Sequence, residues 1–237
     1  MVGTAEVDEA PAKSRAKRGA VSAIYETKPA TYYAAARMDM VALLTTGPDA
    51  AVLELGCGSG GTGKAIKAAG KAGRYVGIEL SPEAGELASE VLDRVVIGNV
   101  EELDLQEFAG QFDALVFSEV LEHLIDPWTV LGRLVTCLKP GGVVIVGGPN
   151  VAHWQIVRDL ILGRFRYQEA GPMDRTHLRW FTPESYRSMF EGAGLAVDAL
   201  LPTNPRRGWK PKLINALTGG RLSHLFMTQV LVTGHRR

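Results

Sequence analysis

The stretch Val52-Leu53-Glu54-Leu55-Gly56-Cys57-Gly58-Ser59-Gly60 decides the fold expected for this chain of 237 residues. Apart from Glu54, its first four residues are apolar, which suits a short buried strand of a parallel sheet. The glycines that follow allow a tight backbone turn beneath a ligand that side chains would exclude. A helix is expected to continue over Lys64–Ala69. The stretch therefore predicts a strand, a turn and a helix that hold a nucleoside cofactor.

The glycine spacing by itself fits two classes of cofactor. The glycines at positions 56, 58 and 61 match the G-x-G-x-x-G spacing of a dinucleotide-binding turn. Glu54 argues against a dinucleotide, because a carboxylate would repel a pyrophosphate and attract a cationic amino-acid and sulfonium ligand. A second apolar strand, Tyr75–Leu80, places Glu79 where an acid can accept hydrogen bonds from both ribose hydroxyls. That position fits either cofactor.

Motifs farther along the chain extend this pattern. We expect a third strand at Arg94–Ile97 and a fourth at Phe112–Phe117, and Leu138-Lys139-Pro140-Gly141-Gly142 precedes a fifth at Val143–Val146. Together with the features above, this order of motifs resembles the class I S-adenosylmethionine-dependent methyltransferases over about residues 25–233. The resemblance implies an α/β fold with a doubly wound, mostly parallel, seven-stranded Rossmann-like sheet whose last strand is antiparallel. It also implies S-adenosylmethionine as the cofactor.

The resemblance indicates which residues bind that cofactor. Many relatives carry an aspartate at the place of Asn99, where it bonds the adenine amino group, and an asparagine carbonyl can accept the same hydrogen bond. Arg37, in a helix expected over Ala30–Leu44, would lie close to the cofactor or the acceptor. The implied cofactor-binding residues are Glu54, Gly56, Cys57, Gly58, Gly60, Glu79, Leu80, Asn99, Val100 and Ser118.

The last third of the chain changes the pattern. Gly194–Leu201 and Met227–Thr233 are expected to form an antiparallel strand pair, because the segment between them is too short for a crossover helix with loops. Two inserts, 149–181 and 202–226, leave the carboxyl side of the sheet and are rich in arginine and lysine. Arginine binds phosphate and carboxylate well, so the inserts favour an anionic acceptor, phosphorylated or nucleotide-linked. Solvated surface arginine is the alternative.

A cluster of acids and histidines follows the fourth strand. Glu119, Glu122 and His123 have the i, i+3, i+4 spacing of one helical face, and His177 arrives later in the chain. The set resembles the E-x-x-E-H plus distant histidine of small-RNA 3′-end 2′-O-methyltransferases, and its first part resembles ubiquinone-pathway O-methyltransferases. In those families it implies a divalent metal, and these ligands suit a magnesium-like or manganese-like ion.

Two kinds of role are thus open for these side chains. The candidate metal ligands are Glu119, Glu122, His123 and His177, and the candidate catalytic residues are His177, His123 and Glu119. A metal-free role of His177 or His123 as general base is one alternative, and a structural role is the other.

Composition limits the function further. Lys and Arg together number 26, as do Asp and Glu, and the resulting net charge of zero does not favour a bulk nucleic-acid binder. Two cysteines imply no disulfide framework, and no run approaches the roughly twenty apolar residues of a membrane span. Residues 1–20 mix acids and bases among small residues, which predicts a disordered tail before a single domain over residues 21–237. A cytoplasmic location is expected.

These observations predict an S-adenosylmethionine-dependent methyltransferase that methylates an oxygen of a sugar-like or nucleotide-linked small molecule. One alternative is an RNA-end 2′-O-methyltransferase, which the four candidate ligands and the basic inserts motivate. The other is a non-catalytic protein that binds S-adenosylmethionine for a regulatory purpose, because an intact cofactor site shows only that binding is expected.

Overall fold

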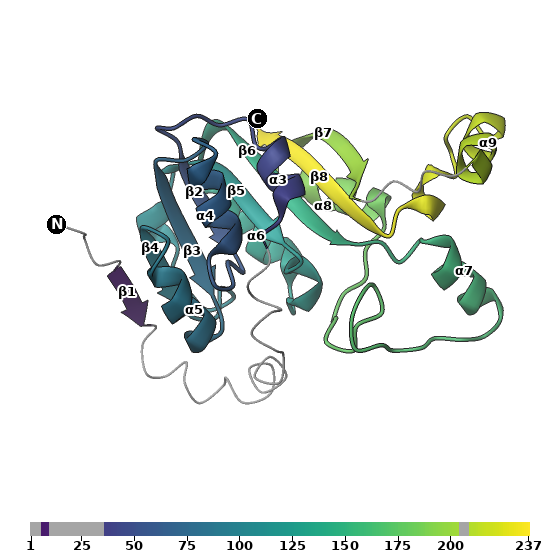
Figure 1. Cartoon of the computed structure of the whole chain (residues 1–237), viewed down its shortest axis with the longest axis horizontal. Coiled ribbons are helices and arrows are strands. Elements are labelled where there is room, and N and C mark those ends of the chain that lie inside the picture. Colours follow the sequence, from purple (N-terminus) through teal and green to yellow (C-terminus); the bar gives the residue numbers. More distant parts are fainter. Residues whose placement is uncertain (1–5, 10–35, 204–208) are drawn as a thin grey trace.

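The computed structural model describes residues 6–9, 36–203 and 209–237. Within this part of the chain, eight strands form one sheet in the order β1-β4-β3-β2-β5-β6-β8-β7 (Figure 1). The strands are β1 (Glu6–Glu9), β2 (Ala51–Leu55), β3 (Arg74–Glu79), β4 (Arg94–Ile97), β5 (Phe112–Ser118), β6 (Leu138–Pro149), β7 (Leu195–Pro202) and β8 (Gln229–Arg236).

Helices alternate with the first strands, and later helices lie in and between the two inserts. The α-helices are α3 (Met38–Leu43), α4 (Gly61–Ala68), α5 (Pro82–Ser89), α6 (Pro127–Val135), α7 (Trp154–Ile161), α8 (Pro183–Gly192) and α9 (Trp209–Leu217). Short 3₁₀ helices cover Gln106–Phe108, Leu121–His123 and Ser223–Phe226. Of the helix expected over Ala30–Leu44, the structure shows α3, and residues 30–35 lie outside the described part.

The strand directions confirm the predicted fold. Strands β4, β3, β2, β5 and β6 pair in parallel, whereas β8 is antiparallel to both of its neighbours, β6 and β7. The predicted seven-stranded sheet is therefore present with its antiparallel last strand. Its final two strands are the pair expected from the sequence, joined by a segment that contains α9.

An eighth strand lies in the N-terminal segment, for which a disordered tail over residues 1–20 stays a prediction. Glu6–Glu9 pairs in parallel with β4. Without β1, β4 would be an edge strand, and the unpaired backbone groups of an edge accept an additional strand readily. Residues 1–5 and 10–20 lie outside the described part of the chain.

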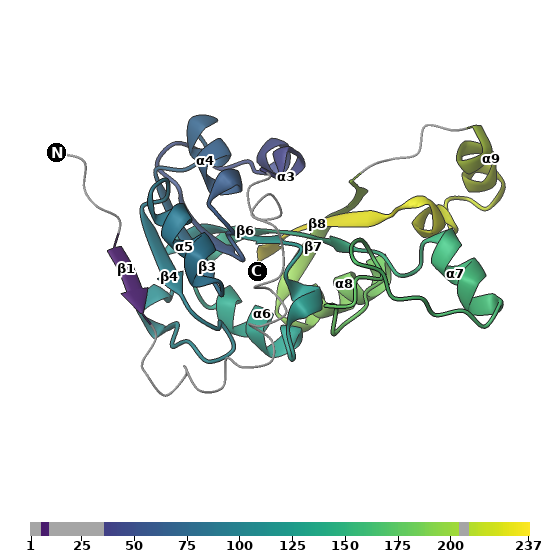
Figure 2. The same cartoon turned by 60° about the horizontal axis from the view of Figure 1, so that its bottom comes forward.

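Helices cover both faces of the sheet. One core cluster joins residues of α3, α4 and α5 to one face, and a second joins residues of α6 and α8 to the other. Figure 2 shows the two groups on opposite sides of the sheet. Alternating residues of β2 supply both clusters: Val52 packs on the first face, and Leu53 and Leu55 pack on the second. This two-residue period explains why the strand is apolar almost throughout.

The candidate site residues gather where the parallel strands of this sheet end. The carboxyl ends of the parallel strands β2, β3, β4 and β5 lie on the same side of the sheet, where ligands of open α/β sheets bind.

Within the described residues, no helix has both the length and the apolar character that crossing a bilayer would require.

Candidate active site

The glycine turn after β2 has the tight geometry predicted for it. Gly56, Gly58 and Gly60 have φ angles of 70°, 55° and 80°, a region that residues with a Cβ rarely adopt. The backbone amides of Gly56 and Cys57 donate to the carbonyl oxygen of Ile78 at 2.8 and 3.3 Å. These bonds hold the turn against β3, at the carboxyl edge of the sheet.

Glu79 is fixed at the end of β3 by two backbone donors. The amide of Gly58 donates to its Oε2 and the amide of Ser81 donates to its Oε1, each at 2.9 Å. Ser81 caps α5, and Pro82 opens that helix, as the sequence predicted. The carboxyl group is buried, and this burial raises its pKa despite the hydrogen bonds it accepts. Each oxygen has a second acceptor position, so the group can still receive the hydroxyls of a ribose.

Glu54 lies deeper than the turn and is 1 % exposed. Its Oε2 accepts a hydrogen bond from the hydroxyl of Tyr75 at 2.9 Å. Burial raises the pKa of this carboxyl group to about 8, which the Tyr75 bond only partly opposes. We expected a charged carboxylate here, but a pKa of about 8 means that the group retains its proton at neutral pH. A cationic ligand nearby would lower its pKa again.

The remaining predicted cofactor residues lie at the same edge. Asn99 follows β4, and its side-chain oxygen accepts the amide of Glu101 at 3.1 Å, which closes a local turn. That oxygen has one further acceptor position for an adenine amino group. Val100 is buried, Leu80 directly follows β3, and Ser118 is the last residue of β5.

Glu119 departs from its predicted place on a helical face. Its φ angle is 51°, which turns the chain out of β5 before the 3₁₀ helix Leu121–His123 begins. Arg37 donates to its Oε1 at 3.0 Å and Gln229 donates to its Oε2 at 3.3 Å. The carboxylate therefore pairs with the segment before α3 rather than with the histidines. The 3₁₀ geometry replaces the α-helical spacing on which the prediction depended.

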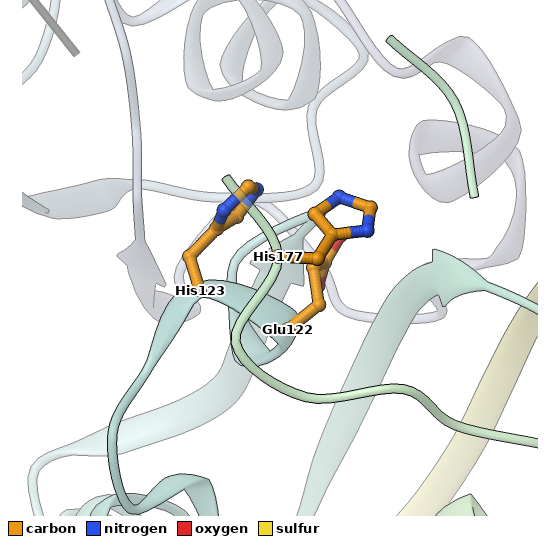
Figure 3. Close-up of side chains that lie close together, drawn as sticks. All are labelled: Glu122, His123 and His177. Atoms are coloured by element: carbon orange, nitrogen blue, oxygen red, sulfur yellow. The ribbon is translucent and has the colours of Figure 1, made fainter. Parts of the chain in front are cut away.

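The other three candidate ligands do come together. One ligand atom from each of Glu122, His123 and His177 lies within 4.8 Å of the others, and all three side chains are buried (Figure 3). Both carboxylate oxygens of Glu122 are buried without a hydrogen-bond partner. Burial, followed by the charge of Glu119, raises the pKa of Glu122 well above its usual range. A buried carboxyl group without a donor is costly unless a proton or a cation satisfies it.

Backbone carbonyls orient both imidazole rings. Nδ1 of His123 lies 3.2 Å from the carbonyl oxygen of Thr176, and Nδ1 of His177 lies 3.3 Å from that of Pro172. A carbonyl oxygen only accepts, so each Nδ1 donates a proton to the backbone, and in the neutral ring the lone pair is then on Nε2. The rings meet edge to face with their centroids 4.8 Å apart. Histidines that bind a metal usually donate their other ring N–H to such a carbonyl oxygen.

The sequence did not assign roles to the groups that support this cluster. Asp174 accepts both the amide and the hydroxyl of Thr176 at 2.9 and 2.8 Å, and all of these atoms are buried. The amide of Leu178 donates to the carbonyl oxygen of Glu122 at 2.8 Å, which joins the distant loop to the 3₁₀ helix. The D-x-T-H spacing of the loop is a signal that could have identified Asp174 as its organiser.

Tyr186 is a second residue that the sequence did not single out. It lies on α8, is fully buried, and its hydroxyl has no hydrogen-bond partner. Burial, followed by the charges of Glu122 and Glu119, raises its pKa well above the usual value. Two buried polar groups without partners, those of Tyr186 and Glu122, thus belong to one region of the site. No short sequence motif connects them.

Comparison with known proteins identifies the family. The family model described as a methyltransferase domain matches residues 27–200. The chain belongs to this family. The predicted S-adenosylmethionine-dependent methyltransferase of class I is thereby confirmed at the level of the family, whose cofactor is S-adenosylmethionine. The neighbouring solved structures agree on the fold.

Each of the individual relatives matches only part of this chain. A ubiquinone biosynthesis O-methyltransferase of Xanthomonas campestris is 33% identical over 120 residues, which are 48% of this chain and 49% of that protein. A probable S-adenosylmethionine-dependent methyltransferase of Mycolicibacterium smegmatis is 34% identical over 154 residues, 62% of this chain and 58% of the relative. The chain spans about half the length of the curated relatives it matches. The YcgJ protein from Bacillus subtilis has a similar fold, with a TM-score of 0.59, 20% identity and coverage of 84% and 97% of the two chains.

Proposed function

We propose that this methyltransferase transfers the methyl group of S-adenosylmethionine to a hydroxyl oxygen of a sugar-like or nucleotide-linked small molecule. The buried carboxyl group of Glu122, which has no hydrogen-bond partner and faces two oriented imidazoles, is the observation that carries the proposal. The name of the Xanthomonas relative, an O-methyltransferase, supports oxygen as the acceptor atom.

The cluster fits a divalent metal on its own chemistry. Glu122, His123 and His177 offer one carboxylate and two imidazole nitrogens whose lone pairs are set by the backbone carbonyls. A cation would satisfy the two oxygens that have no donor. Two imidazoles in a set of three favour an ion such as Mn²⁺ over Mg²⁺, because Mg²⁺ prefers oxygen ligands. When bound, the metal would lower the pKa of an acceptor hydroxyl.

The residues of the chain divide the remaining tasks between donor and acceptor. The glycine turn and Glu79 hold the nucleoside end of the donor at the edge of the sheet. The cluster after β5 places the acceptor hydroxyl. This placement is the main requirement, since a displacement at the methyl carbon depends mainly on bringing nucleophile and carbon to near-attack distance. If no metal is bound, Nε2 of His177 or His123 is the group that accepts the hydroxyl proton.

Metal binding can be tested separately from methyl transfer. We would titrate Mn²⁺ into the protein with S-adenosylhomocysteine and follow the free ion by electron paramagnetic resonance. Glu122→Gln and His177→Ala should each weaken binding at least about tenfold. His235→Ala is the matched control, because His235 is a half-buried histidine of β8 that pairs with Asp198. Equal Mn²⁺ binding by wild type and Glu122→Gln would remove the metal from the proposal.

The acceptor is tested with a panel of sugars, sugar phosphates and nucleotides that carry free hydroxyls. Radiolabelled methyl from S-adenosylmethionine should appear on one class, and NMR should place it on oxygen. Chelation should stop the reaction if the metal acts, whereas His177→Ala should depress turnover in either case and leave cofactor binding intact. A methyl group found on nitrogen or carbon would overturn the proposal.

A further inference from the structure

A separate cavity lies in the first insert. The structure has a cavity of about 310 Å³ formed by α7 and the segment after it. Figures 1 and 2 show α7 at one end of the molecule, beyond the sheet. The polar residues of the lining include three arginines, and several apolar side chains complete it. The residues used below are Arg158, Arg164, Arg166, Leu160, Phe165 and Pro172.

The charge around this cavity is positive. Arg158 pairs with Asp159 at 2.7 Å and lies over the ring of Trp154. Among the described residues, no carboxylate pairs with the side chain of Arg164 or Arg166. Both are nevertheless near Asp159, whose pKa is lowered first by the hydrogen bond from Arg158 and further by the charges of all three arginines. Three guanidinium groups thus lie near one carboxylate in a concave region, and one of the three is paired with it.

The cavity is also connected to the cluster that holds the acceptor. Pro172 lines the cavity, and its carbonyl oxygen accepts the hydrogen bond from Nδ1 of His177. Met173, the next residue, lines the cavity as well. The wall of the cavity therefore continues into the loop that carries His177. The cavity and the cluster thus share one loop, Pro172 to His177.

Other arginines of the insert already have local roles. Arg175 pairs with Glu169, and Arg179 donates to the carbonyl oxygens of Leu178 and Ile125. Neither lines the cavity. The basic character noted in the sequence therefore separates into arginines with local partners and arginines that surround a concave space. Arginine forks in such a space bind phosphate well.

We infer that this cavity is a subsite for a phosphate group of the acceptor, held by Arg158, Arg164 and Arg166. The inference rests on the proposed function, because it assigns the acceptor of the same reaction to the phosphate esters. Leu160 and Phe165 are 46 % and 47 % exposed and line the cavity beside the arginines. The phosphate is thus carried on a group that can contact apolar side chains, such as a sugar face or an alkyl chain.

The experiment measures binding and does not require methyl transfer. Inorganic phosphate, glucose 1-phosphate and hexyl phosphate are titrated calorimetrically into the full-length protein with S-adenosylhomocysteine bound, and hexanoate is the carboxylate comparison. The double variant Arg164→Gln/Arg166→Gln should weaken phosphate-ester binding at least about tenfold. Arg175→Gln is the matched control and should leave it unchanged. Circular dichroism and the affinity for S-adenosylhomocysteine check that the variants are folded.

The outcomes separate this inference from the proposed function. Binding that is lost in the double variant and retained in Arg175→Gln supports the subsite even if no O-methylated product is found. Tighter binding of glucose 1-phosphate than of hexyl phosphate assigns the attached group to sugars, and the reverse assigns it to lipid-like esters. No binding of any phosphate to the wild type, equal loss in Arg175→Gln, or tighter binding of hexanoate than of hexyl phosphate would overturn the inference.

Discussion

The cofactor turn and the cluster after β5 both lie where the parallel strands end, but their carboxyl groups differ in whether they accept hydrogen bonds. In the turn, Glu79 accepts two backbone amides and Glu54 accepts the hydroxyl of Tyr75. In the cluster, neither oxygen of Glu122 has a donor. The predicted cofactor residues are thus held by internal hydrogen bonds, whereas Glu122 is buried without one. This contrast can be tested by equivalent substitutions in the two regions.

The largest effect is expected from filling the space behind the turn. A Cβ at Gly77 would lie 2.4 Å from the Sγ atom of Cys57, so Gly77→Val should force the turn away from β3. We expect a loss of about 3 kcal/mol or more in the free energy of unfolding and no measurable cofactor binding. Urea unfolding and calorimetry measure the two effects. Gly47→Val, where nothing lies within 4 Å, is the control, and equal behaviour of both variants would refute the packing argument.

Removal of the carboxylate that organises the turn should have a smaller effect. Glu79→Ala frees the amides of Gly58 and Ser81 and removes the acceptor for the ribose hydroxyls. The affinity for S-adenosylhomocysteine should fall by about 2 kcal/mol, measured by calorimetry. Glu83→Ala alters an exposed acid of the same helix start and should have no effect. An unchanged affinity of Glu79→Ala would mean that the ribose lies elsewhere.

The raised pKa of Glu54 predicts a pH dependence of stability. Its ordinary value of 4.5 applies to the unfolded chain, and its folded value is about 8. Between them the folded state retains a proton that the unfolded state releases, so the free energy of unfolding falls as the pH rises. The contribution is complete below about pH 4.5 and is lost by about pH 8, with a slope of about 1.4 kcal/mol per pH unit between these values.

This slope can be assigned to Glu54 by comparing two proteins. Glu54→Gln cannot ionise and should unfold in urea with a flatter dependence between pH 5 and pH 8 than the wild type. The pKa of Glu122 is raised as well, and Glu122 contributes to the pH dependence of both proteins. The difference between the two slopes therefore reports on Glu54. Parallel curves would show that Glu54 does not hold a proton in the folded state.

The smallest effect is expected at the acid that the structure removes from the cluster. Glu119 is held by Arg37 and Gln229, so Glu119→Gln should change the affinity for Mn²⁺ less than about threefold. Glu122→Gln in the same titration should change it at least about tenfold. Similar losses in the two variants would mean that Glu119 leaves Arg37 when the ion binds, and the cluster would then have four ligands.

Local chemistry made the cofactor half of the fold predictable. Positive φ angles favour glycine, Glu79 stands at the end of a strand, and Ser81 with Pro82 starts a helix. Each of these features depends on only a few neighbouring residues of the sequence. The cluster was predictable only in part. His177 was found from a resemblance, whereas the left-handed φ of Glu119 and the buried hydroxyl of Tyr186 depend on contacts between distant segments. Such contacts leave no local pattern that a reader of the sequence could use.

The position of β8 has a consequence for how the chain acquires its structure. This strand is synthesised after all the others described, yet it lies between β6 and β7 in the sheet. Until the ribosome has delivered Gln229–Arg236, β7 has no neighbour to pair with, and the edge of β6 stays open to other chains. The nascent protein can pair the parallel strands from β2 to β6 early, but β7 can join the sheet only after β8 has been synthesised. Arrest of translation before β8 would therefore produce an aggregation-prone intermediate with a folded cofactor half.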